Sequence, residues 1–155
     1  MKRIICIGNR YDTRDEAGPK VYDRLAQNGL PHDVEVIDGG LAGLDLLRFV
    51  DGSERVVFVD AVSGFSHRAG VVVVDVDEVM EQTSAPYDHA AGLPYLLRVL
   101  PEVCQGTTPE IFLVGLEGPP GEEAVLAAAE LSLALAVEGC AANALARRAL
   151  SGTSG

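Results

Sequence analysis

The stretch RVVFVDAV, residues 55–62, is a run of apolar, mostly β-branched residues that carries one acid, Asp60, near its end. Runs of this length and composition are typical of a strand that is buried on both faces of a parallel sheet. A carboxylate in such a strand needs an explanation. For a single aspartate the ordinary explanations are a helix cap or a hydrogen bond to a loop, and the alternative is a ligand or catalytic position.

Further strands are predicted on both sides of this stretch. They are short apolar or alternating segments at residues 3–8, 33–38, 70–76 and 110–116. The connection from residues 55–62 to residues 70–76 contains glycine and has the length of a hairpin loop, which favours an antiparallel direction for the segment 70–76.

Helical patterns separate most of these strands. They cover residues 19–29, 43–50, 92–100 and 122–150, and the last is expected to break near Gly139. This alternation predicts an α/β fold, a three-layer sandwich in which a mostly parallel, twisted five-stranded sheet has helices on both faces. One domain is expected over residues 1–150, followed by a disordered tail at 151–155.

Composition narrows the class of protein. The chain has 155 residues, of which 48% are hydrophobic, so it can bury one sizeable core. A net charge of -11 disfavours nucleic acid and anionic membranes as partners. The N-terminal apolar run is too short for a signal peptide, and no apolar run long enough to span a membrane follows. Three cysteines without a C-x-x-C spacing predict buried, reduced thiols and a cytoplasmic protein; they are Cys6, Cys104 and Cys140.

Acidic residues converge on one predicted edge of the sheet. In open α/β sheets, ligands collect beyond the carboxyl ends of the strands where the strand order reverses, commonly between strands one and three. Asp60 lies at the end of strand three, and the loop after strand one carries Asp12, Asp15 and Glu16. Right-handed crossovers would bring these acids to the same edge.

His89 comes directly before the predicted helix at 92–100. A histidine together with two carboxylates is a plausible ligand set for nickel or zinc, because imidazole and carboxylate oxygen both suit these ions. The sequence spacing of the three residues has no value as a motif, so a capping or surface role for His89 stays open. His32 and His67 are interpreted as solvated loop residues.

Other catalytic signatures are absent from the sequence. It has no G-x-G-x-x-G segment, no P-loop lysine and no G-x-S-x-G elbow, so neither a phosphate cradle nor a conventional nucleophile is evident. Two alternatives therefore remain beside a metal-dependent enzyme: a non-catalytic metal- or nucleotide-binding α/β module, and another small α/β hydrolase.

Several segments resemble, in order, the motifs of one known family, the hydrogenase maturation proteases. These endopeptidases trim the C-terminal extension from the large subunit of nickel-iron hydrogenases. The resembling segments are IGNRYDTRDEAGPKV (7–21), VIDGGLAGLDLL (36–47), VVFVDAV (56–62), DHAAGLPYLL (88–97) and PEIFLVGLEGP (109–119).

The resemblance implies a metal-binding trio of Asp15, Asp60 and His89, with the two aspartates as catalytic residues of an aspartyl-type protease. An ungapped alignment places Asp15 at the acidic ligand position and Arg14 where a further acid is usual. Glu16 would replace Asp15 only if the loop shifts by one residue.

The resemblance also implies a substrate-binding turn and a substrate. The turn is formed by Gly39, Gly40 and Leu41, and Leu41 stands where the family usually has threonine. The implied partner is a hydrogenase large-subunit precursor, and this protein is expected to act on it as a monomer. The implied metal is nickel, recognised in that substrate and held weakly or not at all by the isolated protein. The attacking group stays open: a carboxylate could activate water, or a metal could supply bound hydroxide.

Overall fold

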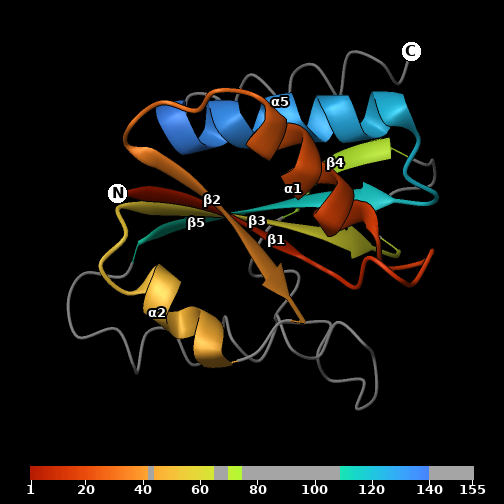
Figure 1. Ribbon diagram of the computed structural model, residues 1–155, viewed down its shortest axis with the longest axis horizontal. Helices are drawn as coiled ribbons and strands as arrows, with labels where there is room; N and C mark the ends of the chain where they lie inside the picture. The colour runs from red at the N-terminus through yellow and green to blue at the C-terminus, as the bar shows by residue number, and fades with distance from the viewer. Residues whose placement is uncertain (42–43, 65–69, 75–108, 140–155) are drawn as a thin grey trace.

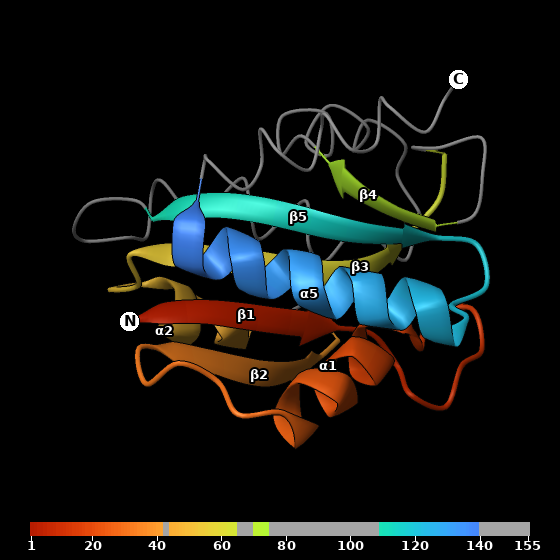
Figure 2. The same ribbon diagram turned by 90° about the horizontal axis from the view of Figure 1, so that it is seen from above.

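A computed structural model describes residues 1–41, 44–64, 70–74 and 109–139. These residues form a five-stranded, mostly parallel sheet with helices on both faces, as Figures 1 and 2 show. The predicted α/β fold class is confirmed. Several predictions fall outside the described residues: the helix at 92–100, the tail at 151–155, Cys104, Cys140, His67 and His89.

The strands occupy the predicted segments and are arranged in the order β2-β1-β3-β5-β4. All neighbouring pairs are parallel except β4 and β5, which are antiparallel. The strand bounds are β1 (Lys2–Ile7), β2 (Val34–Gly40), β3 (Arg55–Val62), β4 (Gly70–Val74) and β5 (Glu110–Glu117).

The position of β4 differs from what a hairpin would give. Its antiparallel direction is confirmed, but its partner is β5 and not the preceding strand β3. The reason is that β5 takes the free edge of β3 over the full length of that strand, from the pair Arg55 and Glu110 to the pair Val62 and Glu117. Beyond β5 the edge of the sheet is then open to β4 (Figure 2).

The described helices are α1 (Ala17–Gln27), a 3-10 turn η1 (Leu44–Leu46), α2 (Leu47–Val50) and α5 (Glu122–Glu138). The predicted short helix over 43–50 is confirmed for its described part, which divides into the 3-10 turn and a single α-turn. Gly52, with φ of 82°, follows closely and favours a turn over further helix. The predicted break near Gly139 is confirmed: α5 ends there on a glycine with φ of 65°.

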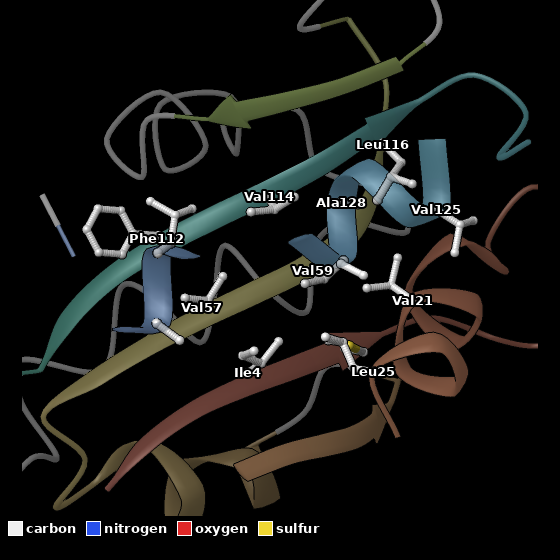
Figure 3. Close-up of a cluster of buried hydrophobic side chains, with 14 of the residues drawn as sticks. Ile4, Val21, Leu25, Val57, Val59, Phe112, Val114, Leu116, Val125 and Ala128 are labelled. Atoms are coloured by element: carbon white, nitrogen blue, oxygen red, sulfur yellow. The ribbon is translucent and has the colours of Figure 1, made fainter. Parts of the chain in front are cut away.

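Two hydrophobic cores cover the two faces of the sheet. One lies under α1 and α5, and Figure 3 shows Val21 and Leu25 of α1 packed towards Ile4 and Val59 of the sheet. The other lies under α2, where Phe58 is fully buried. Full burial of each such side chain contributes about 1.5–3 kcal/mol, so the sheet is held rigidly from both sides.

The strand order creates a switch point between β1 and β3. From β1 the chain first adds β2 on one side, and it then returns past β1 to add β3 on the other side. The carboxyl ends of β1 and β3 therefore lie next to each other at the point where the strand order reverses. This is the edge where the sequence predicts the acidic site.

Candidate functional site

Asp60 is buried near the carboxyl end of β3. It pairs in register with Gly115 of β5, and the residue is only 8% exposed. Burial is the main cause that raises the pKa of Asp60 to about 8, and the charge of Asp15 raises it further. A hydrogen bond with the backbone of Ala61 acts in the opposite direction. Asp60 therefore holds its proton at neutral pH.

The loop that carries Asp15 is folded back onto the end of β1. Gly8 has a φ of 145°, and a Cβ at this position would overlap the carbonyl oxygen of Asp15, so only glycine fits. The N–H of Asn9 donates a hydrogen bond to Oδ2 of Asp15 at 3.1 Å. The N–H of Asp15 donates to the carbonyl of Asp12 at 2.9 Å. Backbone contacts thus fix the position of the Asp15 carboxylate.

Glu16 has a different partner. Its carboxylate forms an ion pair with Lys20 at 3.0 Å, one turn further along α1. Among the described acids, Asp15 is the one whose charge acts on the pKa of Asp60. The structure therefore brings Asp15 together with Asp60 and places Glu16 at the start of the helix, as the ungapped alignment requires. The catalytic and ligand roles of these residues stay predictions.

Gly39 and Gly40, which the sequence predicts as part of a turn, are the last two residues of β2 and border the same loop. Gly8 donates its N–H to the carbonyl of Gly40 at 2.8 Å. A Cβ on Gly39 would lie 2.9 Å from Cγ2 of Ile5, so the turn passes too close to β1 for a side chain. Leu41, at the end of the turn, is 73% exposed. The predicted substrate-binding turn of Gly39, Gly40 and Leu41 thus lies beside the acidic loop.

Two residues with structural roles in this region, Asn9 and Arg10, carry no predicted role in the sequence. Asn9 contacts Asp15, as described above. Arg10 forms ion pairs with Asp23 of α1 at 3.3 Å and with Asp38 of β2 at 3.2 Å. These partners are 13 and 28 residues away in sequence, so no local pattern could have indicated them.

A complete metal-ligand set is not present in the described part of the chain. No group of three or more histidine, cysteine, aspartate or glutamate side chains there could hold a metal ion. His89, the predicted third ligand, lies outside the described residues. What the structure does hold is a pair of carboxyl groups in which the charge of Asp15 opposes the ionisation of Asp60.

Two further expectations concern residues away from the pair. Cys6 is buried and free, and burial, followed by the charge of Asp38, raises the pKa of its thiol. The prediction of a buried thiol is confirmed for this cysteine. A buried thiol with a raised pKa is unreactive. His32 is exposed, as expected of a loop residue. No described helix is long and apolar enough to cross a membrane.

Comparison with known proteins identifies the family of this chain. The family described as HycI, hydrogenase maturation protease, matches residues 19–139. The chain belongs to the hydrogenase maturation protease family. The matched range contains Asp60 and the glycine turn, but it begins after Asp15, so the assignment of Asp15 depends on the opening motif and on its position beside Asp60.

Individual relatives support the same family. The hydrogenase 2 maturation protease of Escherichia coli is 28% identical over 100 residues, which are 63% of this chain and 61% of that protein. HupD, a hydrogenase expression/formation protein of Rhodobacter capsulatus, is 33% identical over 76 residues, 48% of this chain and 36% of that one. The chain thus matches less than two thirds of the length of either relative.

Among solved structures, the hydrogenase maturating endopeptidase HybD from Escherichia coli superimposes with a TM-score of 0.72. It is 27% identical, and the match covers 90% of this chain and 94% of that one. The fold of the maturation proteases therefore extends over nearly the whole length of both chains.

Proposed function

We propose that this protein is an endopeptidase that removes the C-terminal extension from a nickel-iron hydrogenase large-subunit precursor after nickel insertion. The observation that carries the proposal is the buried carboxyl group of Asp60, which meets the charge of Asp15 at the switch point of the sheet. Membership of the hydrogenase maturation protease family supports the reaction class. The relatives named as maturation protease and maturating endopeptidase support it as well.

Nickel enters this proposal as part of the substrate. Two carboxylates at one point attract a divalent cation, and the imidazole of His89 would add a nitrogen ligand of the kind nickel accepts. Because Asp60 holds its proton at neutral pH, a metal ion has to displace that proton before both carboxylates can bind it. The isolated protein should therefore bind nickel weakly. Nickel inside the precursor arrives with other ligands already in place.

Asp15 and Asp60 are also the proposed catalytic groups. In hydrolysis by a carboxyl pair, one carboxylate takes a proton from water while the water oxygen bonds to the peptide carbonyl carbon. The other carboxyl group gives its proton to the amine nitrogen as the C–N bond breaks. Asp60 suits the second role because burial keeps it protonated. Since Asp60 cannot bind nickel and hold this proton at once, the two roles are used in succession.

The expected setting follows from the substrate and the charge. We place the protein in the cytoplasm, as a monomer that meets the large-subunit precursor. The net charge of -11 makes nucleic acid and anionic membranes poor partners.

The test compares nickel-loaded and nickel-free precursor. Each is incubated with the purified, chelator-treated protein, and the intact mass of the large subunit is followed with time. The nickel-loaded precursor should lose its C-terminal extension, while the nickel-free precursor should stay intact. Equal cleavage of both forms would refute nickel recognition, and no cleavage of either would refute the proposed protease.

A further inference from the structure

Two highly exposed hydrophobic side chains lie at the edge of the sheet that holds Asp15 and Asp60. Tyr11, in the loop after β1, is 92% exposed, and Leu41, directly after β2, is 73% exposed. The other exposed large hydrophobic residues in the described ranges reach 48% at most. Because β1 and β2 are parallel neighbours, Tyr11 and Leu41 both extend beyond the same edge.

Arg10 joins the two loops that carry these side chains. Its Nη2 lies 3.2 Å from Oδ2 of Asp38, three residues before Leu41. Its Nη1 lies 3.3 Å from Oδ2 of Asp23 on α1, so one guanidinium group links the loop after β1 to two elements of the fold, α1 and β2. Each ion pair is partly exposed and contributes little on its own to global stability. The effect of Arg10 is therefore mainly local, on the relative position of the two loops.

Hydrogen bonds fix the backbone on both sides of this arginine. The N–H of Gly8 bonds the carbonyl of Gly40 at 2.8 Å, and the N–H of Tyr11 bonds Oδ1 of Asn9 at 2.9 Å. Tyr11 and Leu41 therefore extend from ordered backbone. A ligand that covers them pays a smaller ordering cost than one that binds free loop tips.

We propose that Tyr11 and Leu41 form a docking surface for an apolar segment of the hydrogenase large-subunit precursor, and that Arg10 is the positioning residue that links the two loops carrying them. This inference rests on the proposed function. Its basis is continuity with the candidate site, because the same loop provides the Asn9 N–H that bonds the Asp15 carboxylate.

The size and charge of the surface favour this occupant. Two side chains offer at most about 400 Å² of contact area, whereas a stable dimer needs about 800 Å² from each partner. A short segment fits this area better than a second copy of the chain. The guanidinium of Arg10 is already paired, and Asp12, Asp23 and Asp38 lie close by. The segment should therefore carry apolar side chains and no acidic ones.

The experiment measures KM and kcat with nickel-loaded precursor. The double variant Tyr11→Ser/Leu41→Ser should raise KM about tenfold and leave kcat nearly unchanged, as expected when contacts made equally in ground and transition states are lost. Tyr11→Phe keeps the ring and should keep the wild-type KM. Both substituted side chains are exposed, so the fold should survive the changes.

The positioning role of Arg10 has its own readout. Arg10→Ala should raise KM about threefold and speed amide hydrogen exchange in residues 8–13 and 38–41. Arg10→Lys should restore part of the KM. Lys2→Ala is the matched control, since it removes one partly exposed ion pair, with Asp33 at 3.2 Å, at the opposite edge of the sheet. It should change neither KM nor exchange in the two loops.

The outcomes separate this inference from the proposed function. If the wild-type protein cleaves the precursor but the Tyr11/Leu41 variant keeps the wild-type KM, the docking surface is refuted and the protease proposal stands. If the wild type cleaves nothing, both fall. Unchanged hydrogen exchange or unchanged KM in Arg10→Ala refutes the positioning role. If the wild type self-associates and the double variant does not, the occupant of the docking surface is a second copy of the chain and not the precursor segment.

Discussion

Charged side chains are arranged differently at the two edges of the sheet. At the amino edge, basic residues at the start of the strands are paired with acids or with helix ends. At the carboxyl edge, the acids Asp15 and Asp60 are held near each other, and the pKa of Asp60 rises as a result of burial and of this proximity. The same rigid sheet supports both arrangements.

Arg3 and Arg55 show how the amino edge is stabilised. Arg55 of β3 donates to the carbonyl of Ala136 near the end of α5 at 2.7 Å and forms an ion pair with Glu110 at 3.0 Å. Arg3 of β1 does the same on the other face, where it donates to the carbonyl of Phe49 in α2 at 2.9 Å. Cations near helix C-termini donate hydrogen bonds to the last carbonyl groups, and they interact favourably with the negative end of the helix dipole.

In the part of the chain that the structure describes, Asp60 has no comparable ion pair, and a hydrogen bond with the backbone of Ala61 is what favours its charged form. A buried acid near a second acid costs stability in its ionised form. Under the proposed function, the amino edge serves stability and the carboxyl edge serves chemistry. Substitutions at the two edges should therefore have different consequences, which experiments can test.

The largest expected effect is on cleavage of the precursor. Asp60→Asn keeps the size of the side chain but removes its titratable proton, so cleavage should fall by at least about 100-fold. The intact mass of nickel-loaded precursor measures this. The fold should survive, because asparagine has nearly the shape of a protonated aspartate and never carries a charge.

His89→Ala tests the predicted third member of the site in the same assay. Loss of cleavage is expected if its imidazole meets the nickel of the precursor. His67→Ala should be nearly silent, because His67 is interpreted as a solvated loop residue. Full activity of the His89 variant would remove that residue from the site.

The next effect is on stability as a function of pH. Unfolded Asp60 titrates near its ordinary value of 3.8, whereas in the folded protein its pKa is raised to about 8. Between these values only the folded state keeps the proton, so the free energy of unfolding falls as the pH rises through this window. Asp60→Asn has no such dependence. Its advantage over the wild type should grow to a few kcal/mol by about pH 8.

Urea unfolding at several pH values measures this difference. The two stability curves should be separated by a constant amount below about pH 4 and should diverge above it. Curves that stay parallel up to about pH 9 would mean that burial does not perturb Asp60.

A smaller effect is expected from the amino edge. Arg55→Ala removes the hydrogen bond to Ala136 and the ion pair with Glu110, so the free energy of unfolding should fall by about 1–3 kcal/mol. Cleavage per folded molecule should stay at the wild-type level. A stable variant with impaired cleavage would contradict the division of roles between the two edges.

The smallest effect is expected at Lys2. Its ion pair with Asp33, at 3.2 Å, is partly exposed, and such pairs contribute about 0–1 kcal/mol. Lys2→Ala should change urea unfolding by less than about 1 kcal/mol. This difference should shrink further in high salt. A loss as large as that of Arg55→Ala would show that Lys2 has a role beyond this pair.

The sequence predicted what depends on local pattern. The apolar runs of the strands and the position of Asp60 at a strand end follow from side-chain burial, so the sheet and its switch point were predictable. The partner of β4 was not, because sheet pairing between distant segments leaves no local signal. The links from Arg10 to Asp23 and Asp38 were unpredictable for the same reason. The choice of Asp15 over Glu16 depended on a loop register that only the folded contacts specify.

The titration of Asp60 itself tests most directly whether the carboxyl edge holds a buried acid near a second acid. Carboxyl carbon chemical shifts of aspartate-labelled protein can be followed by NMR from about pH 3 to pH 10, in the wild type and in Asp15→Asn. We expect Asp60 to titrate near 8 in the wild type and at a lower pH in the variant, where burial remains but the neighbouring charge is gone. Titration near 4 in both proteins would contradict the claim that the carboxyl edge holds a buried acid against a second one.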